Sequence, residues 1–122
     1  MARLACFLDP GRSLQDSVKR VRDAESLGYD SVWVTHIAAR EPLQVLSAYA
    51  HGTSSIGLGT GVVPMALRHP ALMAMEAATL DEISGGRLRL GIGVSHKVTI
   101  EGWYGLSLED PIGRMREYAT IV

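Results

Sequence analysis

Residues 77–93 read AATLDEISGGRLRLGIG, and this stretch decides the fold. In its first half, apolar residues recur at helical spacing up to Ile83, and the glycine pair at 85 and 86 ends the helix because glycine adopts backbone angles that other residues avoid. From Leu88 to Ile92 the chain has a short apolar run that is typical of a buried strand. The stretch therefore predicts a helix that turns sharply into a buried strand, as in an α/β fold.

The same alternation of strand and helix continues towards the N-terminus. We predict strands over 4–8, 31–34, 56–63 and 88–92. Their starts lie 27, 25 and 32 residues apart, from 4 to 31, 31 to 56 and 56 to 88. This spacing is typical of consecutive right-handed crossovers, so the sequence predicts a parallel sheet made of four βα units.

The helices between these strands are marked by the residues at their ends. Ser13 is the predicted N-cap of the first helix, Pro42 lies where the second begins, and His69 is the predicted cap of the third. Beyond the fourth strand we expect an irregular loop over 100–111 and a further helix over 112–122.

Two architectures share this alternation and spacing of strands and helices: a doubly wound open sheet and the first strands of a (β/α)8 TIM barrel. A dinucleotide-binding sheet places G-x-G-x-x-G at the turn from strand to helix. Here Gly57, Gly59 and Gly61 alternate within a strand, and Val62 stands where the third glycine of the fingerprint would fall. Alternating glycines in a strand indicate instead a bare face that a ring or another backbone approaches closely.

Composition narrows the function classes. The 122 residues are 47% hydrophobic with a formal net charge of −1, which predicts one domain and no basic surface for nucleic acid. No apolar run reaches the ~20 residues of a membrane span, and the start at Met1 and Ala2 runs into a strand pattern without a leader, so we expect a cytoplasmic protein. Cys6 has no partner for a disulfide, and no histidines or acids have metal-ligand spacing.

Four stretches resemble the luciferase-like monooxygenase family: LGYDSVWV at 27–34, IGLGTGV at 56–62, RHP at 68–70 and the segment at 77–93. The resemblance covers nearly the whole chain, and the residues near the second strand are most similar to members that use the deazaflavin coenzyme F-420 rather than FMN. It implies a (β/α)8 barrel, a fold of about 250 residues. Residues 1–122 would then be its N-terminal half, the first four βα units, without the later loops that usually hold a cofactor phosphate.

Barrel enzymes carry their chemistry at the carboxyl ends of the strands. The resemblance implies cofactor contacts from Thr35 and His36 after the second strand, and His36 as a catalytic hydrogen-bond donor. The alternative is a solvated loop histidine, and the acidic-histidine pair common in relatives is replaced here by His36-Ile37.

The third and fourth strand ends supply the remaining candidates. The resemblance implies a cofactor-binding stretch at Thr60, Gly61 and Val62, where relatives hold a non-prolyl cis peptide behind the central ring. It implies further cofactor contacts from the residues after the fourth strand, Gly93, Val94 and Ser95. It also implies that the next residue, His96, is a catalytic proton donor. Plain strand residues and an exposed loop histidine are the alternatives.

The resulting hypothesis is hydride transfer between coenzyme F-420 and a small organic substrate. FMN-dependent monooxygenation is one alternative, and a non-catalytic half-barrel that only oligomerises is another. We expect no nucleic-acid or membrane partner, no metal, a homo-oligomer, and no turnover by the 122 residues alone.

Overall fold

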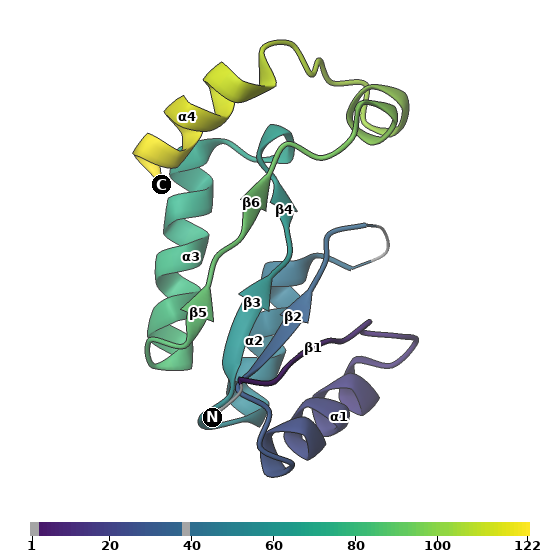
Figure 1. The fold of residues 1–122 in the computed structure, drawn as a ribbon, viewed down its shortest axis with the longest axis vertical. Helices are drawn as coiled ribbons and strands as arrows, with labels where there is room; N and C mark the ends of the chain where they lie inside the picture. The colour runs from purple at the N-terminus through teal and green to yellow at the C-terminus, as the bar shows by residue number, and fades with distance from the viewer. Residues whose placement is uncertain (1–2, 38–39) are drawn as a thin grey trace.

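Parallel strands in chain order form the centre of the computed structural model, which describes residues 3–37 and 40–122 (Figure 1). One sheet has the order β1-β2-β3-β5, and β4 pairs with β6 beside it. Sequential neighbours confirm the barrel-type arrangement and exclude the doubly wound sheet, whose first strand would lie between others. The described strands are β1 (Ala5–Phe7), β2 (Ser31–Val34), β3 (Gly57–Thr60), β4 (Val63–Pro64), β5 (Leu88–Arg89) and β6 (Ile92–Gly93).

The helices begin where the sequence predicts. Ser13 Oγ accepts from the Asp16 amide at 3.2 Å, and His69 Nδ1 accepts from the Ala71 amide at 3.3 Å, so both predicted caps are confirmed. Within the described residues, no helix is both long and apolar enough to cross a membrane. The helices are α1 (Leu14–Ser26), α2 (Pro42–Gly52), the short η1 (Met65–Leu67), α3 (Pro70–Ser84), the π-helix η2 (Val98–Trp103) and α4 (Pro111–Ile121).

Two predicted features need correction. The segment 100–111 is not wholly irregular, because η2 extends to Trp103 and buries Ile100 completely. The third and fourth strands are each broken in two, at Gly61 and at Gly91 respectively. The break follows from hydrogen bonding: Thr60 Oγ1 accepts from the Gly91 amide and donates to the Gly91 carbonyl, which replaces the regular ladder there.

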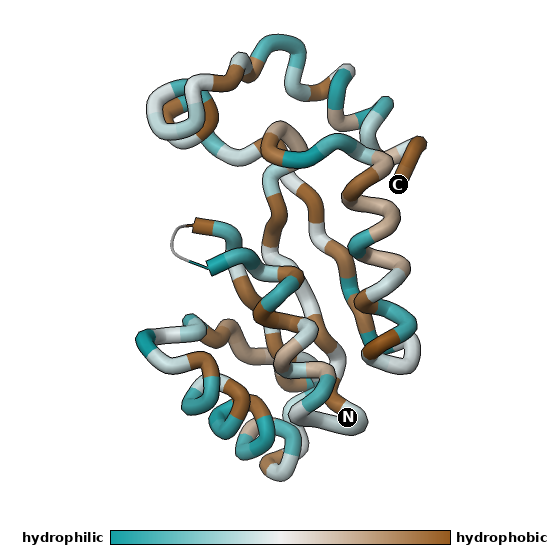
Figure 2. Tube along the Cα trace, turned by 180° about the vertical axis from the view of Figure 1, so that it is seen from behind, coloured by the Kyte–Doolittle hydropathy of each residue, from teal (hydrophilic) through white to brown (hydrophobic). Residues whose placement is uncertain are grey.

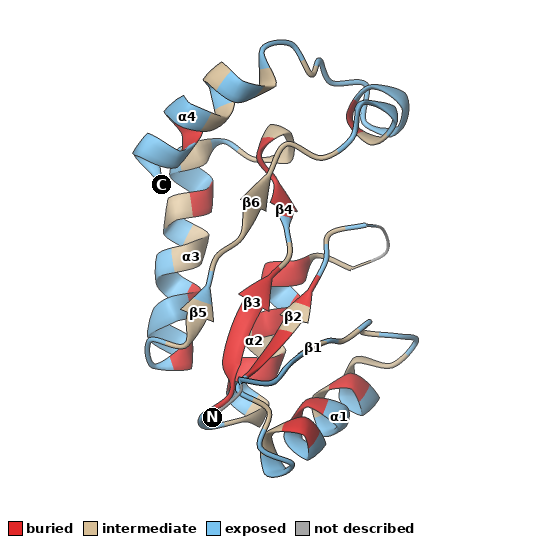
Figure 3. Ribbon diagram, viewed as in Figure 1, coloured by how far each residue is buried: buried red, intermediate tan, exposed pale blue. Residues whose placement is uncertain are grey.

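Burial increases across the sheet from β1, which is mostly exposed, to β2 and β3, which are mostly buried (Figure 3). On the face towards the helices, Val32 and Leu58 are fully buried. On the other face, Phe7, Trp33 and Gly59 share one row of the register, and Phe7 is 69% exposed. Figure 2, seen from behind, shows hydrophilic and hydrophobic residues alternating along α1. The core therefore lies between the sheet and the helix layer.

Candidate functional site

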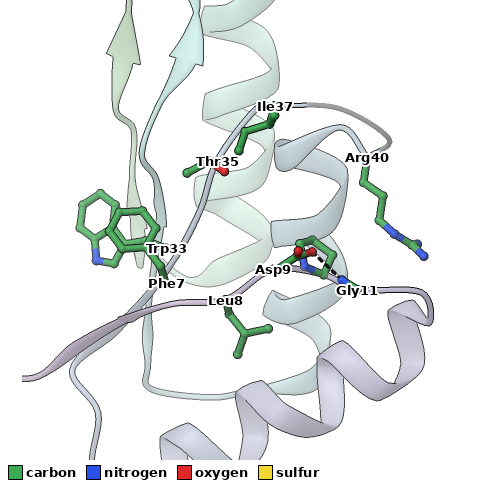
Figure 4. Close-up of a pocket in the computed structure, with 9 residues that line it drawn as sticks. Phe7, Leu8, Asp9, Gly11, Trp33, Thr35, Ile37 and Arg40 are labelled. Carbon is green, nitrogen blue, oxygen red and sulfur yellow. Dashed lines mark hydrogen bonds between the residues drawn. The ribbon is translucent and has the colours of Figure 1, made fainter.

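A cavity of about 610 Å³ lies beyond the carboxyl ends of β1 and β2 (Figure 4). This is the end of the strands where (β/α)8 barrels carry their sites. Its wall combines apolar rings with polar groups from the loops that follow the two strands. The lining residues are Phe7, Leu8, Asp9, Pro10, Gly11, Trp33, Thr35, Ile37 and Arg40.

Two aromatic rings of the cavity wall lie over the glycines of the third strand. A methyl group added to Gly59 would collide with the Trp33 ring, and one added to Gly61 would lie 3.0 Å from Phe7 Cε1. Trp33 is held by its indole Nε1, which donates to Ser31 Oγ at 3.0 Å. The glycines therefore leave space on this face of the strand, as predicted. In this chain the rings of Trp33 and Phe7 occupy that space.

His36 is half-buried at the end of β2 and is tied to neighbouring segments at both backbone and ring. Its amide donates to the Val62 carbonyl at 3.3 Å, and its Nε2 lies 3.4 Å from Tyr104 Oη. Its Nδ1 is buried and has no hydrogen-bond partner among the residues that the structure describes. Burial lowers the pKa of His36, the Arg68 charge lowers it further, and Glu41 opposes this. Burial and the Arg68 charge therefore favour the neutral imidazole, which has one N–H to donate.

The two threonine candidates lie in different environments. Thr35 is exposed and lines the cavity. Thr60 is fully buried, and its hydroxyl is used in both directions by Gly91, donating at 2.9 Å and accepting at 2.8 Å. We therefore interpret the Thr60 side chain as a link between strands, which leaves Thr35 as the candidate threonine that lines the cavity.

Val62 is the point where three strand ends meet. The peptide bond between Gly61 and Val62 is cis, as expected for this stretch, and Val62 is 40% exposed. Gly61 donates to the Val34 carbonyl at 2.8 Å, and a methyl group on Gly93 would lie 2.5 Å from Val62 Cγ2. The ends of β2, β3 and β6 therefore converge around Val62.

The remaining candidates follow β6. Val94 packs against the core. Ser95 has a φ of 64°, a left-handed backbone conformation that is uncommon for residues other than glycine. His96 is exposed, and its carbonyl accepts from the Ile100 amide at 2.9 Å. In the described part of the chain, no hydrogen bond joins the His96 ring to the other candidates.

Sequence reasoning missed several groups near this site. It gave Arg68 and Glu76 no joint role, although both belong to one ion-pair network with Glu41. It also missed Arg40, which lines the cavity from the loop after β2. No spacing signal identifies these residues, because they come from separate elements. The contact of Tyr104 with His36 is likewise a product of the tertiary fold.

Four βα units in chain order, with a cavity at the carboxyl ends of their strands, define a segment of a (β/α)8 barrel. The chain belongs to the luciferase-like monooxygenase family, whose model matches residues 1–122. A Mycobacterium tuberculosis protein that carries the name coenzyme F-420-dependent oxidoreductase is 39% identical over 108 residues, which make up 88% of this chain and 31% of that protein. A 5,10-methylenetetrahydromethanopterin reductase of Archaeoglobus fulgidus is 43% identical over 103 residues, 84% of this chain and 31% of the relative.

Solved structures agree with this placement. The coenzyme F-420-dependent tetrahydromethanopterin reductase of Methanopyrus kandleri matches with a TM-score of 0.78 at 33% identity, over 86% of this chain and 30% of that one. The FMN complex of the oxygenating constituent of 3,6-diketocamphane monooxygenase from Pseudomonas putida matches with a TM-score of 0.83 over 98% of this chain and 38% of that one. At 22% identity, this second likeness shows the fold alone. The chain spans about a third of the length of the curated relatives it matches.

Proposed function

We propose that these residues form part of a barrel enzyme that transfers hydride between coenzyme F-420 and a small organic substrate. The observation that carries the proposal is the convergence of His36, Val62 and Gly93 at the carboxyl ends of neighbouring parallel strands. The cavity, which Thr35 and Ile37 on either side of His36 help to line, and the similarity to relatives named for F-420 or for a methanopterin reductase support it.

The residues fit a planar redox ring. The buried Nδ1 of His36 lacks a partner among the described residues, and Val62 exposes an apolar surface next to it. Thr35, His36, Val62 and Gly93 would hold the ring, which supplies the hydride when bound. The neutral imidazole of His36 would donate a hydrogen bond to its polar edge, and the later strands would complete the exclusion of water. His96 remains a second candidate for moving a proton, from the loop after β6.

The test is a fluorescence titration of F-420 and of FMN into the complete barrel that carries these residues. We expect F-420 to bind at least about tenfold more tightly, a difference of about 1.4 kcal/mol. His36→Gln should weaken F-420 binding, whereas His51→Gln, an exposed histidine at the end of α2, should not. Equal or tighter FMN binding would favour the monooxygenase alternative.

We propose further that the protein acts in the cytoplasm as a homo-oligomer without a nucleic-acid partner, and that the 122 residues alone turn over no substrate. Four of eight units would leave the cofactor phosphate without the later loops that usually bind it. Gel filtration with absorbance detection tests this: a colourless oligomer is expected, and a monomer that keeps cofactor through desalting contradicts it.

A further inference from the structure

A tyrosine from a distant part of the chain reaches the ring of His36. Tyr104 lies 68 residues further along, and its hydroxyl oxygen is 3.4 Å from His36 Nε2. Among the described residues, this is the only hydrogen bond that either side chain makes. Hydrogen bonds between catalytic groups are often long in a ligand-free site and shorten when the ligand binds. The contact therefore joins the end of β2 to the segment after β6 at the candidate site.

The π-helix η2 holds Tyr104 in place. Ile100, within η2, is fully buried, and its amide donates to the His96 carbonyl at 2.9 Å. The Tyr104 amide donates to the Thr99 carbonyl at 3.3 Å. The Leu106 amide then donates to the Ile100 carbonyl at 3.0 Å. Short π-helical turns are rare and are frequent at functional sites. An anchored turn therefore presents the phenol, which is itself 41% exposed.

The two ring nitrogens of His36 have different surroundings. Nε2 faces the Tyr104 hydroxyl, whereas Nδ1 is buried and has no hydrogen-bond partner among the described residues. A neutral imidazole carries one hydrogen, and the hydrogen bond made by one nitrogen decides whether the other carries it. A phenol donates more readily than it accepts, because its lone pair is delocalised into the ring. The Tyr104 hydroxyl therefore donates to Nε2, and the hydrogen of the imidazole lies on Nδ1.

We propose that Tyr104 is a positioning residue for His36: its hydroxyl donates to Nε2 and thereby keeps the single ring hydrogen on Nδ1. A buried N–H without an acceptor is rare in a folded protein, so the unpaired Nδ1 indicates a missing acceptor. A bound ligand supplies that acceptor, and here the inference rests on the proposed function, in which a redox ring accepts from His36. Tyr104 thus acts on the ligand through His36, not by direct contact.

Nuclear magnetic resonance of the 122-residue chain, labelled with nitrogen-15 in its histidines, tests this without any cofactor. Long-range proton–nitrogen spectra at mildly alkaline pH, where the imidazole is neutral, distinguish a ring nitrogen that carries hydrogen from one that does not. The signals of His36 are assigned with a His36→Gln variant. We expect hydrogen on Nδ1 and none on Nε2, the reverse of the preference of an isolated histidine. A His36 ring with its hydrogen on Nε2 overturns the proposal.

Tyr104→Phe isolates the hydroxyl, because phenylalanine keeps the ring and loses only the oxygen. We expect the hydrogen of His36 to move towards Nε2 while the through-space contacts between the two rings remain. Tyr29→Phe is the matched control: it makes the same change in a partly buried tyrosine that precedes β2, at the opposite end of the strand from His36. A purely structural role of Tyr104 predicts an unchanged hydrogen position in Tyr104→Phe, and that result overturns the proposal.

The complete barrel supplies the functional arm of the test. Loss of the Tyr104 hydroxyl should weaken F-420 binding about threefold to tenfold, as expected for one hydrogen bond, and Tyr29→Phe should leave it unchanged. Equal affinity of Tyr104→Phe and the unmodified barrel contradicts the positioning role. If the unmodified barrel does not bind F-420, the proposed function fails, whereas the position of the ring hydrogen is measured without cofactor; the two failures are therefore distinguishable.

Discussion

The two faces of the sheet differ in how far this chain completes them. Towards the helices, Val32 and Leu58 are fully buried, and consecutive helices pack against one another and against the strands. On the opposite face, which would line the barrel interior, Phe7 is 69% exposed and Val62 is 40% exposed. The helix-facing layer is therefore finished by local βα contacts, whereas the inner layer needs atoms that these residues do not supply.

This difference separates stability from function. Local contacts between adjacent units account for the buried core, so folding depends on the helix-facing side. The candidate site lies at the edge of the inner side, around His36 and Val62. Variants on the two faces should therefore have different effects, and the following predictions test that separation.

The largest effect is expected on the helix-facing side. Leu58→Ala removes a fully buried side chain from the centre of the sheet, and it should lower the free energy of unfolding by about 2–5 kcal/mol. Phe7→Ala removes an exposed ring from β1, on the face opposite the helices, and it should cost less than about 1 kcal/mol. Urea unfolding followed by circular dichroism measures both. Equal losses would show that the inner face is already packed in this chain.

The next effect concerns the junction between the two faces. A methyl group on Gly91 would collide with the Thr60 carbonyl oxygen, which is backbone and cannot turn away. Gly91→Ala should therefore cost about 1–3 kcal/mol through overpacking. Gly102→Ala is the control, because nothing lies within 4 Å of the added group. Thermal unfolding compares the two, and a Gly91→Ala variant as stable as Gly102→Ala would contradict the close approach of these strands.

Helix periodicity and strand spacing predicted the helix-facing side well. The spacing of strand starts gave the parallel order, and Ser13 and His69 gave the helix starts, because capping is a local interaction between near neighbours. The glycines at 59 and 61 correctly indicated a face approached by a ring. They did not identify that ring as Trp33 or Phe7, because partners across strands depend on register.

The candidate site was less predictable, for the same reason. Its groups come from several elements: Arg68, Glu41 and Glu76 meet only when α2 and α3 pack together, and Tyr104 reaches His36 only through the path of the loop after β6. The resemblance supplied the stretch with the cis peptide, at Gly61–Val62, which periodicity does not reveal. The breaks in the strands follow from a side chain, Thr60, that takes over backbone hydrogen bonds.

A smaller effect should come from the hydrogen bonds that the Glu25 carboxylate accepts at the amino ends of the strands. Burial would raise the pKa of Glu25, but amide donors from Ser55, Ile56 and Ser54 together hold it at about 2. Because the pKa in the folded protein lies below the ordinary value of 4.5, Glu25 stabilises the fold above that value, and the contribution is lost as the pH falls towards 2. Glu25→Gln should cost about 1–2 kcal/mol at pH 7 and flatten the pH dependence of stability between pH 5 and 2. Asp23→Asn, an exposed carboxylate on the same helix, is the control; an unchanged slope in Glu25→Gln would contradict the assignment.

The smallest change in stability, with a clear change in assembly, is expected at the inner face. Phe7→Gln should alter the free energy of unfolding by only about 0.5 kcal/mol, because the ring is already 69% exposed. If copies of the chain associate through their inner faces, each interface buries this ring, and burying a phenylalanine is worth about 1.5–3 kcal/mol. Sedimentation should then show dimer association weakened at least about tenfold, since 1.4 kcal/mol corresponds to that factor. Leu27→Gln is the matched control: Leu27 is 75% exposed, yet it lies at the end of α1, away from the inner face. Equal weakening by both variants would show that association uses exposed apolar surface in general, and the inner face would then lose its special place in the comparison.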